Sequence, residues 1–169
     1  MDIEAMLLGI RELRDGVRAR NPPPEEGAPS SEDHIVYFAL VRGTRPYLER
    51  IVHQINGSYE HGWYDASAVM VRRLVETLII ETFERNNLAM KIKDANGDFF
   101  LLGELITRLS AEPSFNLSRP VKKALPELKE VGDKSAHSRY FTAHRKDIEK
   151  LAPHLRVVVQ ELISLARLK

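Results

Sequence analysis

One run of residues, from Trp63 to about Asn87, restricts the fold more than any other part of the chain. Its apolar side chains recur three and four residues apart, which is the spacing of one helical face. They are Ala66, Val69, Met70, Leu74, Leu78 and Phe83, with Val71, Val75, Ile79 and Ile80 widening the stripe. At about 1.5 Å per residue such a helix is roughly 40 Å long. Because an apolar face this broad must be covered by several neighbours, the run predicts the central helix of a bundle.

Shorter helical patterns lie on both sides of this run. Residues 34–41 are apolar without a clear period and favour a helix over a strand. A second helix is predicted from Thr44, a candidate N-cap, to about residue 56, where Asn56-Gly57 breaks the pattern. A third is predicted over residues 99–109, with Asp98 as its cap.

Two more helices are predicted in the last third of the chain. Ser118 can cap a helix over residues 119–131, which Gly132 stops. An amphipathic helix over residues 147–168 closes the chain, with Pro153 marking either a kink or a later start. No hairpin signal, repeat or glycine-rich phosphate loop is present. The sequence therefore predicts an all-α fold, an antiparallel helical bundle.

The first 33 residues predict an appendage to this bundle. Residues 1–20 form an amphipathic helix, which packs either on its own domain or on a partner. Residues 21–33 contain four prolines and no apolar pattern, which is typical of a linker. Residues 34–169 then make up the helical bundle domain.

Composition places the chain among soluble globular proteins, with 169 residues, 43% of them hydrophobic and 29% charged. There is no cysteine, which excludes disulfides and thiolate metal sites and is natural for a reducing compartment. The acidic N-terminus lacks the features of a signal peptide, and no stretch is long enough to span a membrane. We therefore expect a cytoplasmic protein without a membrane partner.

Charge is unevenly distributed, although the net charge is only +1. Residues 119–169 carry 12 Lys+Arg and 6 Asp+Glu, whereas residues 1–118 carry 13 and 18. The basic C-terminal third suits an acidic partner, such as RNA or the acidic part of a second copy of the chain. The alternative is that these charges only solvate the outward faces of helices.

Residues 129–147 gather most of the chemistry of the chain between two helical patterns. His137 and His144 are accompanied by Arg139, Arg145 and Lys134. An imidazole can exchange a proton with a ribose hydroxyl or a leaving group, and a guanidinium can hold a phosphate oxygen. These groups suffice for metal-free RNA cleavage, in which the 2′-hydroxyl attacks the adjacent phosphorus. Alternatively, His137 caps or packs the helix junction.

Other polar groups predict no metal or cofactor site. Asp94–Asp98 resembles part of a calcium loop, but its glycine comes two positions early and Leu105 stands at the twelfth position, so a turn is favoured. The remaining histidines singled out, His34, His53 and His61, lack metal-ligand spacing. Arg72 and Arg73 can pair with Glu76 on one helical face, or one of them can turn towards residues 132–145.

Two segments together resemble the HEPN superfamily. They are Tyr64-Asp65-Ala66-Ser67-Ala68-Val69-Met70-Val71-Arg72-Arg73-Leu74-Val75-Glu76 and Gly132-Asp133-Lys134-Ser135-Ala136-His137, followed by a final helix. The nearest branch is an uncharacterised prokaryotic one with a Gly-Asn/Asp-x-x-Ala-His signature, and the resemblance covers about residues 44–166. It implies a helical bundle that commonly forms a homodimer. Many members are metal-independent endoribonucleases of toxin–antitoxin or phage-defence systems, which implies RNA and a cognate protein as partners.

The sequence departs from the motif of the ribonucleases in this superfamily, which is an arginine, a polar residue, three more residues and a histidine. Counting back from His137, Asp133 fits the polar position, but Gly132 stands where the arginine belongs. Arg139 and His144 have the spacing of the motif, although Tyr140 follows the arginine. The missing cation is therefore supplied by Arg139, Lys134 or Arg72/Arg73, or the ribonuclease chemistry has been lost.

Two hypotheses follow for the function. In the first, an RNA-cleaving or RNA-binding domain uses His137 as general base or acid and Arg139 to hold the phosphate. Asp133 then orients His137 or the loop, His144 and Lys134 are auxiliary, and no cofactor or metal is needed. In the second, the chain is a non-catalytic interaction module whose first helix recruits a second subunit or another protein.

Overall fold

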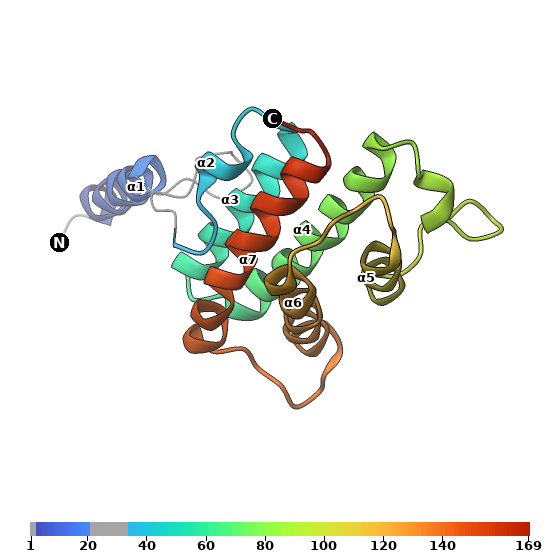
Figure 1. The fold of residues 1–169 in the computed structure, drawn as a ribbon. Helices are drawn as coiled ribbons and strands as arrows, with labels where there is room; N and C mark the ends of the chain where they lie inside the picture. Colours follow the sequence, from blue (N-terminus) through green and yellow to red (C-terminus); the bar gives the residue numbers. More distant parts are fainter. Residues whose placement is uncertain (1–2, 21–33) are drawn as a thin grey trace.

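Helices make up nearly all the regular structure of the residues that the computed structural model describes, 3–20 and 34–169. They are α1 (Ile3–Arg20), α2 (Phe38–Val41), α3 (Pro46–Glu60), α4 (Tyr64–Arg85), the 3-10 helix η2 (Ala89–Ile92), α5 (Leu102–Ala111), α6 (Arg119–His137) and α7 (Arg145–Leu165) (Figure 1). These ranges hold no strand, and one isolated antiparallel bridge joins Lys93 to Phe99. The prediction of an all-α bundle is confirmed.

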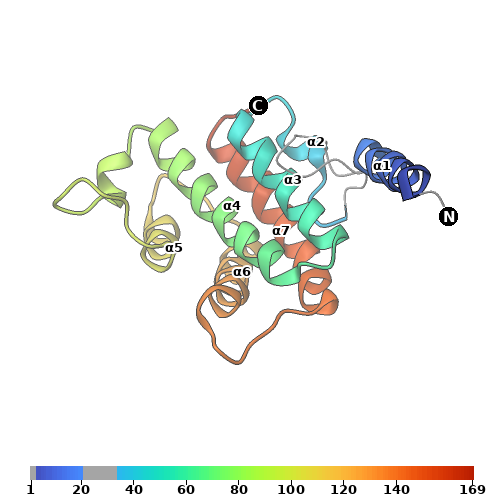
Figure 2. The same cartoon turned by 180° about the vertical axis from the view of Figure 1, so that it is seen from behind.

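The predicted central helix is α4, which contacts α3, α5, α6, α7 and η2. Its broad stripe is buried on several sides, and Val71, Leu74 and Leu78 are fully enclosed. α3 and α4 lie side by side in opposite directions, joined by a tight turn at Gly62 (Figures 1 and 2). The length and width of the apolar pattern thus set the centre of the bundle.

Gly132 does not stop α6, contrary to the prediction, because the helix continues to His137. Gly132 is buried where α6 crosses α4. A Cβ atom at this position would lie 2.5 Å from Arg72 Cβ and 3.1 Å from the carbonyl oxygen of Ala68. The glycine is therefore required by the close approach of two helices and not by a turn.

Asn56-Gly57 does not break α3 either, since this helix continues to Glu60. The Asn56 side chain is buried and serves a neighbouring segment. Its Oδ1 accepts hydrogen bonds from the N–H groups of Ile35 and Val36, each at 3.1 Å, and its Nδ2 donates to the Val36 carbonyl at 2.8 Å. A residue that favours turns in isolation thus fastens residues 35–36 to the bundle.

Several helix starts also differ from prediction. Arg45 and not Thr44 is the N-cap of α3, and α5 begins at Leu102 without a cap from Asp98. The helix expected over residues 34–41 is limited to α2, and α7 begins at Arg145 and runs through Pro153. The Ser118 cap is confirmed, because its Oγ accepts from the Val121 N–H at 3.4 Å.

The turn favoured over a calcium loop at residues 94–98 is also present. Asp94 Oδ1 accepts hydrogen bonds from the N–H groups of Asn96 and Asp98, both at 2.9 Å. The carboxylate therefore closes its own turn.

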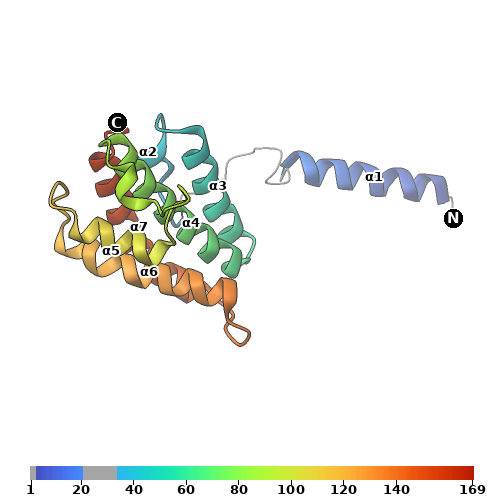
Figure 3. The same cartoon turned by 90° about the vertical axis from the view of Figure 1, so that its right-hand side faces the viewer.

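The amphipathic helix predicted in residues 1–20 is α1, which lies apart from the other helices (Figure 3). The linker predicted for residues 21–33 lies outside the described residues.

Candidate nucleic-acid interface

Two connections meet at one end of the bundle, the lower end in Figures 1 and 2: the α3–α4 turn and the α6–α7 loop. Asp65 in the first turn of α4 accepts a hydrogen bond from the Ala143 N–H in the loop, at 2.9 Å. Arg145 Nε, at the start of α7, donates to the Tyr64 hydroxyl at 3.3 Å. Residues far apart in the sequence are therefore held together here by α4.

Arg145 also belongs to a small aromatic cluster behind this end. Its guanidinium lies over the Tyr59 ring, 5.3 Å from the centroid, and the Tyr59 hydroxyl donates to Glu149 at 2.6 Å. Burial, followed by the hydrogen bond to Glu149, raises the pKa of Tyr59. The cluster keeps Tyr59 a neutral donor and fixes the start of α7.

Exposed aromatic and basic side chains lie on both of these connections. We define the end surface as His61, Trp63, His137, Arg139, Tyr140 and His144, all of which are exposed. Tyr140 is 91% exposed and Trp63 is 55% exposed, and the rings of His61 and Trp63 stack at 5.0 Å. Large aromatic side chains in water beside imidazole and guanidinium groups are typical of surfaces that bind single-stranded nucleic acid.

His137 and Arg139 both lie on this surface, as the sequence suggested. His137 is the last residue of α6, and Arg139 follows in the loop, with its guanidinium 6.0 Å from the Tyr140 ring centroid. Within residues 34–169, no hydrogen bond or ion pair engages the side chain of either residue. The alternative in which His137 packs the helix junction is therefore wrong, and both groups are free to meet a ligand.

Asp133 is engaged elsewhere, so it does not orient His137. Its carboxylate accepts from Arg72 Nε at 2.7 Å and also pairs with Lys129, while Arg72 Nη1 reaches Glu76 at 3.0 Å. The Arg72 side chain thus makes both interactions considered from the sequence. It joins α4 to α6 and supplies no cation to the loop.

Partial burial alone would raise the pKa of Asp133, but the hydrogen bonds from Lys129 and Arg72 outweigh it and hold the pKa below its ordinary value of 3.8. The stability that this carboxylate contributes is therefore complete above about pH 5 and is lost as the pH falls through the folded-state pKa. Between pH 5 and pH 2, the native chain should lose about 1 kcal/mol more unfolding free energy than the Asp133→Asn variant. Urea unfolding across this range measures the difference, and parallel pH profiles for the two proteins would show that the ion pair contributes nothing.

The two auxiliary residues also have structural partners. Lys134 Nζ donates to Glu130 at 2.6 Å along α6, on the exposed face. The N–H of His144 donates to Asp147 Oδ2 at 2.8 Å, which begins α7, and the residue is exposed. His144 thus remains on the end surface, whereas Lys134 is already neutralised by an acid.

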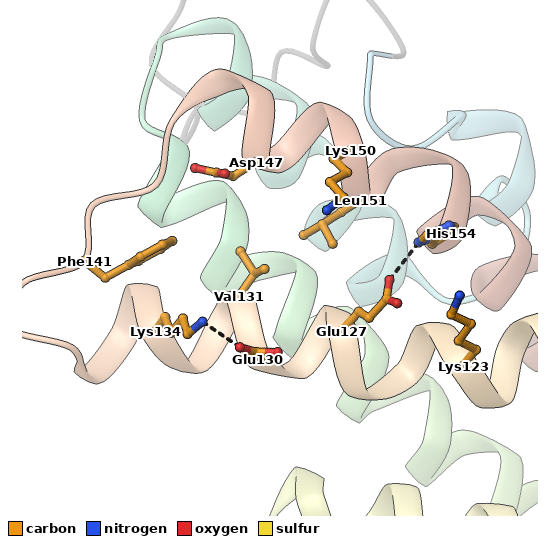
Figure 4. A pocket seen from close by; sticks show the side chains of 10 residues that line it. All are labelled: Lys123, Glu127, Glu130, Val131, Lys134, Phe141, Asp147, Lys150, Leu151 and His154. Atoms are coloured by element: carbon orange, nitrogen blue, oxygen red, sulfur yellow. Dashed lines mark hydrogen bonds and ion pairs between the residues drawn. The ribbon is translucent and has the colours of Figure 1, made fainter.

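A groove of about 560 Å³ runs between α6 and α7 (Figure 4). Val131, Phe141 and Leu151 form its apolar part, and its charged residues are Lys123, Glu127, Glu130, Lys134, Asp147, Lys150 and His154. His154 pairs with Glu127 at 3.1 Å, and Figure 4 shows this pair together with the Lys134–Glu130 pair. Because acidic and basic groups alternate along it, the groove does not select a phosphate, and the end surface is the better candidate for an anionic ligand.

Sequence reasoning found the histidines and arginine of the loop but missed His61 and Trp63 as part of the site. Their signal was present, because a tryptophan beside Gly62 in a helix connection is seldom needed for packing. What the sequence did not show is that the α3–α4 turn lies against the α6–α7 loop.

The described residues contain no group of three or more His, Asp or Glu side chains that could hold a metal ion. Among these residues, every helix is either too short or too polar to span a lipid bilayer.

A family model described as a domain of unknown function, DUF4145, matches residues 53–169. No curated protein and no solved structure matches the chain. The matched residues contain both connections of the end surface and exclude α1.

Proposed function

We propose that this chain, which belongs to the DUF4145 family, binds single-stranded RNA through its end surface. The observation that carries the proposal is the exposed Tyr140 beside Arg139, which makes no ion pair among the described residues, on a loop that Asp65 holds against α4. Bases stack on exposed aromatic rings, and a guanidinium contacts the phosphates between them. Trp63 provides a second ring on the neighbouring turn.

The same surface holds groups for metal-independent cleavage. In this proposal His137 takes the proton from a ribose 2′-hydroxyl as its oxygen attacks the phosphorus. Arg139 stabilises the charge that develops on the phosphate oxygens, and His144 gives a proton to the departing 5′-oxygen. The products are a 2′,3′-cyclic phosphate and a 5′-hydroxyl end. The resemblance to HEPN proteins supports this chemistry, together with a homodimer and a cognate protein partner in a toxin–antitoxin or phage-defence setting.

A non-catalytic interaction module is the second candidate, and two specific observations favour it. Gly132 is a packing residue between α4 and α6, and Asp133 is held by Arg72 and Lys129. Two positions of the ribonuclease motif therefore serve the bundle. If the chain binds RNA without cutting it, the protein is non-catalytic and the end surface is an RNA-binding site only.

The binding test is fluorescence anisotropy with labelled single-stranded RNA in EDTA, at several salt concentrations. The Trp63→Ala/Tyr140→Ala variant should bind at least about 30-fold more weakly, because it loses two stacks and each is worth about 1–3 kcal/mol. Arg139→Ala should weaken binding and lower the salt slope by about one. Arg85→Ala removes the same charge from an exposed position at the far end of α4 and should leave affinity within about twofold.

The cleavage test uses the same RNA, end-labelled, with EDTA present. His137→Ala should abolish cleavage while the melting temperature stays nearly unchanged, since the side chain is exposed and makes no hydrogen bond or ion pair among the described residues. RNA affinity that is undetectable in the native chain, or that is unchanged in both the Trp63→Ala/Tyr140→Ala and the Arg139→Ala variants, would refute the end surface as the site. Binding without cleavage in the native chain would retain binding and remove catalysis.

A further inference from the structure

α1 presents a row of large apolar side chains to water. Met6, Leu7, Ile10 and Leu13 are between 47% and 72% exposed, and the helix lies apart from the bundle (Figure 3). A row of this kind on a single helix is a contact surface for another helix.

α1 is also a poor candidate for a helix that is stable by itself. It has 18 residues, and isolated helices of about this length are marginal in water. Gly9 and Gly16 each weaken it by about 1 kcal/mol relative to alanine, and outside the helix's own backbone no atom of the described residues lies within 4 Å of the space where a Cβ would be. The helical state therefore depends on packing against something else.

The spacing of the apolar residues favours a second copy of the same helix as that partner. Ile3, Ile10 and Val17 recur every seven residues, and Met6 and Leu13 follow the first two at three-residue steps. These are the a and d positions of a heptad repeat. β-Branched residues at a with leucine or a similar side chain at d favour a parallel pair of helices. A helix with this pattern is complementary to a second copy of itself.

We infer that α1 pairs with the α1 of a second copy of the chain, as a parallel two-stranded coiled coil that makes the protein a homodimer. The groove between α6 and α7 fits α1 less well, because Leu151 is buried, Val131 and Phe141 are half-buried, and charged groups of both signs surround them. This inference goes beyond the proposed RNA binding, because it concerns α1 and not the end surface. If both hold, one dimer carries two end surfaces and can engage two sites on one RNA strand.

Light scattering after size-exclusion chromatography tests the surface. The native chain should have about twice its monomer mass of 19.3 kDa, and Leu13→Asp or Ile10→Asp should halve the measured mass. Leu8→Asp is the matched control, since Leu8 is 60% exposed on the same helix but occupies the outward f position, so its dimer should persist. A monomeric native chain, or a dimer that survives Leu13→Asp, would overturn the inference.

Disulfide trapping tests the orientation, and the absence of cysteine makes single-cysteine variants unambiguous. In a parallel pair the two copies of residue 13 face each other, so Leu13→Cys should form a covalent dimer on mild oxidation, whereas Leu8→Cys should not. A disulfide that forms only between the Met6→Cys and Leu13→Cys variants would indicate antiparallel helices and refute the parallel coil. The RNA affinity of the Leu13→Asp variant is measured in the same experiment. A monomer that still binds RNA shows that the dimer has been lost while the end surface is intact.

Discussion

Replacing Gly132 by alanine is expected to lower the free energy of unfolding by about 2 kcal/mol. The new Cβ would lie 2.5 Å from Arg72 Cβ and 3.1 Å from the Ala68 carbonyl oxygen. Neither atom is the free end of a flexible side chain, so α4 and α6 must move apart. This cost exceeds the gain of about 1 kcal/mol that alanine brings to a helix interior.

Gly57→Ala is the matched control for this experiment. Gly57 also lies inside a helix, α3, but nothing is within 4 Å of the position that its Cβ would occupy. The substitution should therefore raise stability by up to about 1 kcal/mol. Chemical denaturation of both variants gives the comparison, and a stable Gly132→Ala protein would show that the helix crossing tolerates a side chain.

The close crossing at Gly132 also limits which residue could supply a cation to the proposed RNA site. An arginine at this position, where the HEPN ribonucleases carry theirs, would place its Cβ in the same space against α4. Arg72 is committed to Asp133 and Glu76, and Lys134 to Glu130. Among the residues considered from the sequence for this role, Arg139 is the one exposed on the loop without an ion pair among the described residues. An RNA site at this end therefore depends on Arg139.

The apolar periodicity of the sequence was sufficient to predict the all-α class and the central position of α4. Helix ends were predicted less well, because Asn56 and Gly132 have turn-forming propensities that tertiary contacts override. Gly132 lies in the helix because another helix passes close to it, and Asn56 because its side chain bonds to a distant backbone. A local sequence pattern cannot reveal either contact, because α4 and residues 35–36 lie far from these positions in the sequence.

The candidate site was predictable to the extent that it is local. His137, Arg139 and His144 are near one another in the sequence, and all three are exposed on the α6–α7 loop or at its ends. The role of Asp133 was not predictable from its spacing to His137, since on α6 its carboxylate faces Arg72. Trp63 joins the surface through the contact between Asp65 and Ala143, residues 78 positions apart.

Replacing Asn56 by alanine is expected to lower the free energy of unfolding by about 3 kcal/mol. The side chain satisfies two N–H groups and one carbonyl of residues 35–36, which are themselves buried. A buried polar group left without a partner costs about 1–3 kcal/mol, and water entering the vacated space recovers part of the sum. Denaturant unfolding measures the loss, and Asn96→Ala, in the exposed turn at residues 94–98, should change stability by less than about 0.5 kcal/mol.

Amide hydrogen exchange shows whether the loss has the proposed cause. The N–H groups of Ile35 and Val36 should exchange much faster in Asn56→Ala. Those in the middle of α4 should exchange faster only by the factor that corresponds to the loss in the global free energy of unfolding. Arg156 on α7 holds the same segment, with its Nε donating to the Ile35 carbonyl at 2.9 Å and its Nη1 to the Tyr37 hydroxyl at 2.7 Å. Helices α3 and α7 thus hold residues 35–37 in place. A pair of α1 helices would therefore be connected to each bundle at a fixed point. Unchanged exchange at Ile35 and Val36 would mean that Arg156 alone suffices to hold this point.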